Sequence, residues 1–388
     1  MALNPVIDML GRRLRLAVIG GGTGSFIGAM HRQSARRDDR YQIVTGIFSS
    51  DQAKSKKDAL ELGIESNRMY ASVQEMLETE SSRKDGIDAV AIMTPNDSHF
   101  DYSMWALERG IDVICDKPMT NTLEEAEILH KNVEETGLVF CLTHNYTGYP
   151  MVRQAKAMVM DGQLGTVRLI QVEYVQGGKA DEEMVFSPDD WKFDPVRGGP
   201  SRVMGDIGTH AHNLARFVTG LEVDEVSAEI GAIVPNRPIH DFGGALLRFD
   251  NGARGSFWVT QAAAGVENCL RIRVSGSKGT LEWMQEIPQA LTFKPLTGPS
   301  QNRTPNGPDT LPLSARCTRL VAGHPEGFPD GFANIYSDAA EAIAARRAGK
   351  QADPLALYFP NSFDGLMGVR FVNSVIESSN ANGKWTKC

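Results

Sequence analysis

The stretch that decides the fold of the first part of this chain is LAVIGGGTGSFIGAMHR, residues 16–32. An apolar run at residues 16–19 stops at three consecutive glycines, and a helix-compatible segment follows Phe26. Glycine adopts a positive φ without a Cβ penalty, and its missing side chain lets the backbone approach a pyrophosphate. The next helix then points its unpaired N–H groups at that anion. Strand, glycine turn and helix therefore predict a dinucleotide-binding unit.

The glycine fingerprint of this turn is incomplete. Gly20 and Gly22 supply its first two glycines, but Ser25 stands where the third is expected. Gly24 and Gly28 are placed to take over the packing role of that third glycine. Many glycine-rich turns bind nothing, so the turn alone does not decide the function. The turn residues that we expect to contact the cofactor are Gly20, Gly22, Thr23, Gly24, Ser25 and Phe26.

Length and composition narrow the class of protein. A chain of 388 residues predicts roughly two to three domains. Its net charge of −8 argues against a nucleic-acid binder, which would present a basic surface. No run approaches the ~18–20 apolar residues of a membrane span, and the N-terminal segment lacks the order of a secretory signal. Five cysteines without a CxxC pair predict no disulfide framework or thiolate zinc site, and they fit a reduced, cytoplasmic protein.

The first part of the chain, residues 1–145, alternates strand-like and helix-like segments. Such alternation predicts a parallel, doubly wound sheet. Thr122 and Glu125 form a capping-box pattern before one of the helices, and Gly137 stands where that helix should end. The expected strands are residues 16–19, 42–48, 87–93, 112–116 and 138–142, and further helices are expected at 53–62 and 100–108.

The second part, residues 146–388, has a different pattern. Strand candidates follow one another at hairpin spacing, and Asn251-Gly252 is a strong hairpin turn signal. The pattern predicts an α+β domain whose last helices can pack back on the first domain. Expected strands are 167–176, 225–234, 244–249, 255–260, 270–274 and 279–284; expected helices are 152–160, 208–217, 331–347 and 364–380; expected loops are 191–202 and 295–312.

Polar residues follow three of the predicted parallel strands, at the edge where open α/β sheets bind ligands. These segments are residues 94–99, 116–118 and 143–146. Lys117 stands directly after a buried strand, where it can hold a substrate hydroxyl or stabilise negative charge as the hydroxyl proton leaves. The alternative is an ordinary surface lysine at a strand end.

A second constellation lies in residues 205–212, GDIGTHAH. If a helix begins around Gly208, Asp206 lies near its N-cap and His210 faces the same end. A carboxylate beside an imidazole fixes its tautomer and raises its basicity, which is the orienter–base pair of acid–base catalysis. Alternatively Asp206 only caps the helix and the histidines are structural. The spacing would also suit two metal ligands, but no third ligand is evident, so we predict no metal site.

Together, these motifs resemble the Gfo/Idh/MocA family of sugar and cyclitol dehydrogenases. The matching segments are the glycine turn and residues 94–99 (TPNDSH), 116–118 (DKP, where the family mostly has EKP), 205–210 (GDIGTH) and 324–336 (HPEGFPDGFANIY). The resemblance implies an N-terminal Rossmann domain and a C-terminal α+β domain with a large open, mostly antiparallel sheet. That sheet often packs against another subunit in the family, so a homodimer or homotetramer is expected.

The resemblance also assigns roles to individual residues. Lys117, Asp206 and His210 match the catalytic lysine, aspartate and histidine of the family. Residues 94–99 match a wall of the cofactor site, and Asp116 matches an acid near the nicotinamide ribose. The cofactor contacts expected outside the glycine turn are Ser49, Ser50, Thr94, Pro95, Asn96, His99, Asp116, Lys117 and Asn145.

The chain departs from the family pattern at several places. Asp116 replaces the commoner glutamate, and Ser49 stands where many members carry an acid that binds the adenosine ribose and repels a 2′-phosphate. With Ser50, Arg32 and Lys54 near that position, NADP becomes tolerable, and the choice between NAD and NADP stays open. Residues 143–150 lack an arginine often found there, so the substrate pocket should differ from that of inositol dehydrogenases.

The expected function is an NAD(P)-dependent oxidoreductase that acts on a secondary hydroxyl of a sugar, sugar derivative or cyclitol. We expect one cleft between the domains to hold the catalytic residues. There His210 takes the hydroxyl proton, Asp206 orients His210, and Lys117 binds the same oxygen; the roles of Lys117 and His210 are exchangeable. The alternatives are redox-assisted elimination or glycoside hydrolysis with a bound nicotinamide, and a non-catalytic nicotinamide sensor. A sensor has no need of an acid–base set.

Overall fold

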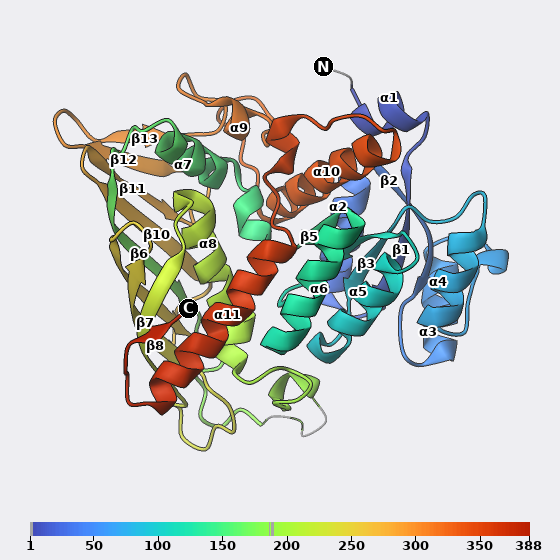
Figure 1. Cartoon of the computed structure of the whole chain (residues 1–388), viewed down its shortest axis with the longest axis horizontal. Coiled ribbons are helices and arrows are strands. Elements are labelled where there is room, and N and C mark those ends of the chain that lie inside the picture. Colours follow the sequence, from blue (N-terminus) through green and yellow to red (C-terminus); the bar gives the residue numbers. More distant parts are fainter. Residues whose placement is uncertain (1–2, 186, 188–189) are drawn as a thin grey trace. The chain divides into compact units, whose positions relative to one another are not determined.

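The computed structural model describes residues 3–185, 187 and 190–388, which divide into two compact units (Figure 1). The first unit runs to Asn145 and also takes up Pro329–Leu366. The second unit comprises Tyr146–Phe328 and Met367–Cys388. Each unit has its own sheet, so we describe the two units separately.

The first unit is a Rossmann fold built on a five-stranded parallel sheet in the order β2-β1-β3-β4-β5. All residues of β3 are buried, as expected of a strand covered on both faces. The strands are β1 (Leu14–Gly20), β2 (Tyr41–Ile47), β3 (Ala89–Met93), β4 (Asp112–Cys115) and β5 (Phe140–Leu142). The helices are α1 (Pro5–Leu10), α2 (Phe26–Arg37), α3 (Gln52–Glu61), α4 (Val73–Ser82), α5 (His99–Leu107), α6 (Leu123–Thr136) and α10 (Phe328–Arg347), the last lying in this unit from Pro329 onward.

The ends of α6 follow the sequence signals closely. Thr122 accepts a hydrogen bond from the backbone of Glu125, whose side chain accepts one from the backbone of Thr122, so the capping box is confirmed. Gly137 ends the helix at φ 64°, a left-handed conformation that glycine adopts readily. The cap fixes where α6 begins, and hence the length of the segment that joins it to β4.

The second unit is built on a nine-stranded sheet in the order β13-β12-β11-β10-β6-β9-β8-β7-β14. Neighbouring strands of this sheet run antiparallel, except for β6 and β9, which run parallel. The strands are β6 (Val167–Val175), β7 (Val223–Gly231), β8 (Phe242–Phe249), β9 (Arg254–Thr260), β10 (Cys269–Gly276), β11 (Gly279–Met284), β12 (Leu291–Pro295), β13 (Gln301–Arg303) and β14 (Thr386–Lys387). The helices are α7 (Pro150–Met160), α8 (Thr209–Thr219), α9 (Pro312–Ala315) and α11 (Ser362–Asn380), the last lying in this unit from Met367 onward.

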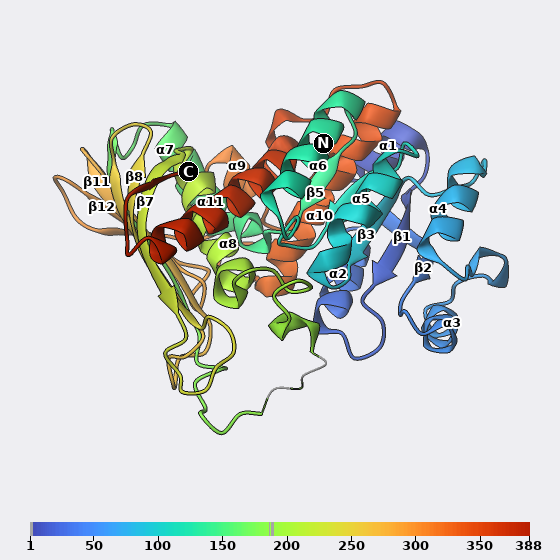
Figure 2. The ribbon, with the colours of Figure 1, turned by 60° about the horizontal axis from the view of Figure 1, so that its bottom comes forward.

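One face of the nine-stranded sheet carries the core of the second unit. Along β6, Ile170, Val172 and Tyr174 are buried on this face, while Gln171 and Glu173 point to the other. In both ribbon views α7 and α8 lie on one side of the sheet (Figures 1 and 2). This alternation fits a sheet with one face packed against helices and one face open.

The predicted fold class is confirmed, with corrections in detail. The expected hairpin at Asn251-Gly252 joins β8 to β9, and Gly252 has φ 86°. The loop expected at residues 295–312 is only partly right, because residues 301–303 pair with β12 as an edge strand. The sequence analysis also missed β12 itself and the helices α1, α4 and α9.

No helix among the described residues is both long and apolar enough to cross a bilayer.

Candidate active site

The glycine turn between β1 and α2 is shaped by close backbone contacts. Gly20, Gly21 and Gly24 have φ of 84°, 66° and 86°. A Cβ on Gly28 would lie 2.1 Å from the carbonyl oxygen of Gly21, so the helix packs directly on the turn. Ser25 is the N-cap of α2 and accepts a hydrogen bond from the Gly28 N–H at 3.1 Å. Gly28 thus fills the packing role left open by Ser25, which serves as a cap.

Two observations on the first unit, one at this turn and one after β5, fit a dinucleotide. A Cβ on Gly24 would meet no atom within 4 Å, so the outer side of the turn has room for a ligand beside the N-terminus of α2. Asn145, which follows β5, is buried, and its Nδ2 has no hydrogen-bond partner among the described residues. A buried amide left without a partner in this way is free to donate a hydrogen bond to a bound group.

The side of the turn that faces α3 holds a carboxylate that the sequence analysis missed. Asp58 is buried and accepts hydrogen bonds from the backbone N–H and the hydroxyl of Thr23. Although burial raises its pKa, these hydrogen bonds lower it below the ordinary value. The signal was its position: Asp58 shares the buried face of α3 with Ser55 and Ala59, where a carboxylate is unusual.

The residues expected near the adenosine ribose are arranged as follows. Ser49 accepts a hydrogen bond from the Asp51 N–H at 3.2 Å, and Ser50 is exposed. The guanidinium of Arg32 donates to the carbonyl of Gly21. Burial is the main cause of a lowered Arg32 pKa, and the neighbouring Arg36 adds to it. The Arg32 guanidinium therefore places a positive charge at the glycine turn.

His99 joins two of the segments at the carboxyl edge of the sheet. Its Nδ1 lies 2.8 Å from the carbonyl oxygen of Pro118, and its Nε2 lies 3.0 Å from that of Thr94. Burial lowers the pKa of His99, so the ring is neutral at pH 7 and donates to one of these carbonyls. Thr94 is further held by the Ser98 hydroxyl, and Asn96 is buried. That residues 94–99 line the cofactor stays a prediction. The contacts of His99 connect this segment to the segment that contains Lys117.

Asp116 is a second acid of the first unit's candidate site that hydrogen bonds hold in place. Its Oδ1 accepts hydrogen bonds from the Thr143 hydroxyl and the Lys117 N–H, each at 2.9 Å. Burial opposes its charge, but the side chain of His31 and the charge of Lys117 outweigh burial and hold the Asp116 pKa well below its usual range. Asp116 is therefore ionised at neutral pH, one residue before the predicted catalytic lysine.

His31 and Tyr336 are residues of this site to which the sequence analysis gave no role. His31 comes from α2, and its Nε2 lies 4.0 Å from Oδ1 of Asp116. Its Nδ1 lies 2.7 Å from the hydroxyl of Tyr336 on α10. The FANIY segment therefore reaches the carboxylate of the DKP segment through one buried histidine. No local sequence signal joins residues 305 positions apart.

The structure corrects the expected position of Asp206. A π-helical turn, Met204–Gly208, runs directly into α8, and Val203 and Gly208 both have right-handed helical dihedrals. The helix therefore begins before Asp206, which lies inside it and not at its N-cap. The interpretation of Asp206 as a mere cap is also wrong. Single π turns inside α-helices are frequent at functional sites, because they re-aim the side chains that they carry.

The carboxylate of Asp206 is held from two sides. Arg202, one turn earlier, forms an ion pair with its Oδ2 at 2.9 Å, and Gln261 donates to the same oxygen at 2.9 Å. Gln261 also donates to the side chain of Gln176 at 3.1 Å. Gln176 and Gln261 directly follow the parallel strands β6 and β9, so their side chains meet at one end of that pair.

Aromatic rings surround His210, which is buried on α8. The edge of its ring meets Tyr146, with centroids 4.9 Å apart, and Tyr174 lies 6.2 Å away. The two tyrosine hydroxyls share a hydrogen bond, and that of Tyr174 also donates to Asn268 at 2.9 Å. Polar side chains thus surround Asp206 and aromatic rings surround His210, and their acid–base role stays a prediction.

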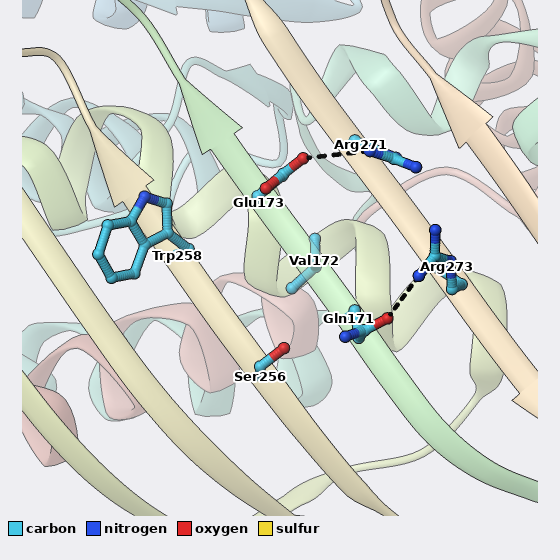
Figure 3. Close-up of a pocket in the computed structure, with 7 residues that line it drawn as sticks. All are labelled: Gln171, Val172, Glu173, Ser256, Trp258, Arg271 and Arg273. Carbon is cyan, nitrogen blue, oxygen red and sulfur yellow. Dashed lines mark hydrogen bonds and ion pairs between the residues drawn. The ribbon is translucent and has the colours of Figure 1, made fainter. Parts of the chain in front are cut away.

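The outer face of the nine-stranded sheet carries a separate pocket, shown in Figure 3. Arg271 pairs with Glu173 at 3.8 Å, and Arg273 donates to Gln171 at 3.2 Å. Trp258 stands beside them. None of the predicted catalytic residues lines this pocket.

Comparisons with known proteins agree with a Rossmann fold in the first part of the chain and a different domain in the second. A model of the oxidoreductase family with an NAD-binding Rossmann fold matches residues 14–146, and one of the GFO/IDH/MocA C-terminal domain matches residues 152–282. The chain is 32% identical over 384 residues to the uncharacterized oxidoreductase YfiI of Bacillus subtilis, covering 98% of each chain. The chain belongs to the Gfo/Idh/MocA oxidoreductase family.

Two solved structures are similar to this chain over nearly its full length. An oxidoreductase from Sinorhizobium meliloti is 44% identical with a TM-score of 0.88, covering 97% of this chain and 100% of that one. An inositol dehydrogenase homologue from Azotobacter vinelandii, solved with NADH and myo-inositol, is 32% identical with a TM-score of 0.90, covering 98% of this chain and 99% of that one.

Among the described residues, no group of three or more His, Cys, Asp or Glu side chains is placed to hold a metal.

Proposed function

We propose that this Gfo/Idh/MocA protein is an NAD(P)-dependent dehydrogenase that acts on a secondary hydroxyl of a sugar, sugar derivative or cyclitol. The observation that carries the proposal is the first unit's arrangement of the glycine turn with the ionised Asp116 and Lys117 at the carboxyl edge of one sheet. The inositol dehydrogenase homologue bound to NADH and myo-inositol supports the same class of reaction.

The acid–base work falls to residues of both units. In the oxidation direction His210 takes the proton of the substrate hydroxyl, while Asp206 supports the charged imidazole. Lys117 hydrogen-bonds the same oxygen and stabilises its developing negative charge. Arg202 and Gln261 keep Asp206 in place. The roles of Lys117 and His210 are exchangeable, and which of the two is the main base stays open.

A nicotinamide dinucleotide supplies the hydride acceptor when bound. The glycine turn, Ser49, Ser50 and residues 94–99 would hold it, and the buried amide of Asn145 would donate to it. The described surroundings do not select strictly for NAD: Ser49 carries no charge to repel a 2′-phosphate, and Arg32 adds a cation at the turn. We therefore propose either NAD or NADP as the cofactor.

A cofactor-reduction screen tests this function. The purified full chain is given NAD or NADP with cyclitols, aldoses, aldonates and glycosides, and the near-ultraviolet absorbance of reduced nicotinamide is followed. Reduction with one substrate is the expected result. Consumption of a sugar without accumulation of reduced nicotinamide would support redox-assisted elimination or hydrolysis. Binding of nicotinamide without any turnover of substrate would support the sensor instead.

We also propose that the outer face of the nine-stranded sheet binds a second copy of the chain. Leu169, Leu246 and Trp258 are 55%, 59% and 48% exposed, although they lie on strands. Large apolar side chains exposed on the open face of a sheet are typical of a protein interface. Size-exclusion chromatography with light scattering should show a dimer or tetramer that Trp258→Glu dissociates, while Ile287→Glu, in an exposed turn, does not. A monomeric wild-type chain at micromolar concentration would contradict the proposal.

A further inference from the structure

Three side chains of the first unit form a buried row that leads from α10 to Asp116. The hydroxyl of Tyr336 lies 2.7 Å from Nδ1 of His31, and Nε2 of His31 lies 4.0 Å from Oδ1 of Asp116. His31 and Tyr336 are each 1% exposed. The rings of Phe332 and Tyr336 meet the His31 ring edge to face, with centroids 4.9 and 5.8 Å away. His31 is therefore enclosed, and each of its two nitrogens faces one defined neighbour.

The hydroxyl of Tyr336 decides which nitrogen of His31 carries a proton. Burial raises the pKa of Tyr336 well above its ordinary value, so the hydroxyl keeps its proton. Among the described residues, the partner of this hydroxyl is Nδ1 of His31. Because a buried hydroxyl proton requires an acceptor, Tyr336 donates to Nδ1. In its neutral form the imidazole then carries its own proton on Nε2, the nitrogen that faces Asp116.

The Nε2 atom of His31 is the unsatisfied end of this row. It is buried and has no hydrogen-bond partner among the described residues. At 4.0 Å it lies just beyond hydrogen-bond distance of Oδ1 of Asp116, whose side chain is 15% exposed. Hydrogen bonds of a catalytic site are often long before a ligand binds and tighten in the complex. A small movement of the more exposed Asp116 would satisfy the buried N–H.

The two oxygens of Asp116 have different surroundings. The Lys117 N–H and the Thr143 hydroxyl both donate to Oδ1, the oxygen that also faces His31. Donors from three sides thus fix one oxygen of the carboxylate. Among the described residues none of these donors reaches Oδ2, so Oδ2 is able to accept a hydrogen bond from a ligand hydroxyl.

We propose that His31 is a positioning residue for Asp116: with its tautomer set by Tyr336, it donates from Nε2 to Oδ1 and so orients Oδ2 to accept a hydroxyl of the bound nicotinamide dinucleotide. This inference rests on the proposed function, which supplies the cofactor and the place of Asp116 beside the nicotinamide ribose. It also gives the FANIY segment, which ends at Tyr336, a part in cofactor binding.

The titratable groups around Asp116 show what a replacement of His31 should change. They are His31 on α2, His99 on α5, Cys115 on β4, Tyr336 on α10 and the adjacent Lys117. Burial lowers the pKa of His99 and raises the pKa of Cys115 and of Tyr336. Burial also opposes the charge of Asp116, and His31 is the first of the groups that outweigh it. Without His31 the Asp116 pKa should rise, so the carboxylate takes up a proton at a higher pH.

The pH dependence of cofactor binding tests this inference without requiring turnover. The full chain is titrated calorimetrically between pH 5 and 8 with NAD or NADP, whichever the wild-type chain binds. Wild-type binding should change little toward pH 5. His31→Leu should bind about tenfold more weakly at pH 5 than at pH 8, since a buried carboxyl that loses its partner is protonated there. Tyr336→Phe, which keeps the ring, should show a smaller loss in the same direction.

Two variants of the first unit serve as matched controls. His130→Leu removes a histidine whose Nδ1 also contacts a hydroxyl, that of Ser362, at 2.9 Å. Tyr41→Phe removes a buried tyrosine hydroxyl that donates to the backbone carbonyl of Tyr336 at 2.9 Å and not to His31. Both should keep the wild-type pH profile of binding. Melting curves at each pH show that all four variants are folded under the conditions of the titration.

The outcomes separate this inference from the proposed function. A loss of affinity toward pH 5 in the His31 and Tyr336 variants, and not in the controls, supports the positioning role. An unchanged profile in His31→Leu, or an equal loss at every pH, would overturn that role and leave the dehydrogenase intact. The expected profile without reduction of the cofactor by any substrate would reject the dehydrogenase and retain the positioning role. A wild-type chain that binds neither NAD nor NADP would reject both.

Discussion

Lys117→Ala and His210→Ala are each expected to lower kcat by about a hundredfold or more while the cofactor still binds. A positioned proton donor or acceptor contributes about 10²–10⁴-fold to such reactions. Lys117 follows β4 beside the ionised Asp116, and His210 sits on α8 within its frame of tyrosines. Steady-state kinetics with the substrate found by the screen give kcat, and fluorescence titration of reduced nicotinamide gives the cofactor affinity.

The controls for this prediction are a lysine and a histidine of the same two units. Lys131→Ala removes an exposed lysine of α6, and His324→Ala removes an exposed histidine of the second unit. Neither should change kcat. Because His210 is buried, His210→Asn is measured beside the alanine variant, and its melting curve shows whether the second unit is folded. Near-full activity in both the Lys117 and the His210 variants would remove the proposed mechanism.

The fold could be predicted where the sequence carries a local physical signal. The wholly apolar stretch of β3 predicted a strand covered on both faces, and the capping box at Thr122 predicted the start of α6. Asn251-Gly252 predicted a hairpin turn. Where the signal is weak, the prediction failed: β13 is three polar residues whose pairing with β12 depends on tertiary context.

The candidate site was predictable only in its motif residues. Parallel strands end at a common edge, so the grouping of residues 94–99, 116–118 and 143–146 follows from strand order. The partners of the motif residues do not follow in this way. Gln261 reaches Asp206 because β9 lies parallel to β6, which strand patterns do not specify. The sequence analysis also missed the π turn at Asp206, because it placed the start of the helix at Gly208.

Gly28→Ala is expected to lower the melting temperature and to weaken dinucleotide binding by more than tenfold. The added Cβ would lie 2.1 Å from the Gly21 carbonyl oxygen and 2.4 Å from its Cα. Such contacts involve backbone on both sides, so a side-chain rotation cannot relieve them. Gly21 cannot withdraw easily, because a Cβ placed on it would already lie 2.5 Å from the Met93 sulfur. The helix must therefore move away from the turn, at a cost of about 1–3 kcal/mol for overpacking.

Gly368→Ala, in α11, is the matched control for this prediction, because both glycines lie in helices. A Cβ on Gly368 would meet nothing within 4 Å, so alanine there should leave the melting temperature unchanged or raise it. The two variants should also differ in dinucleotide binding. Gly28→Ala moves α2 and displaces the backbone N–H groups that face the turn, whereas Gly368→Ala changes α11, which supplies no N–H group to the turn. If Gly28→Ala melts and binds nicotinamide dinucleotide as the wild-type chain does, the close packing of α2 on the turn is not what shapes the cofactor site.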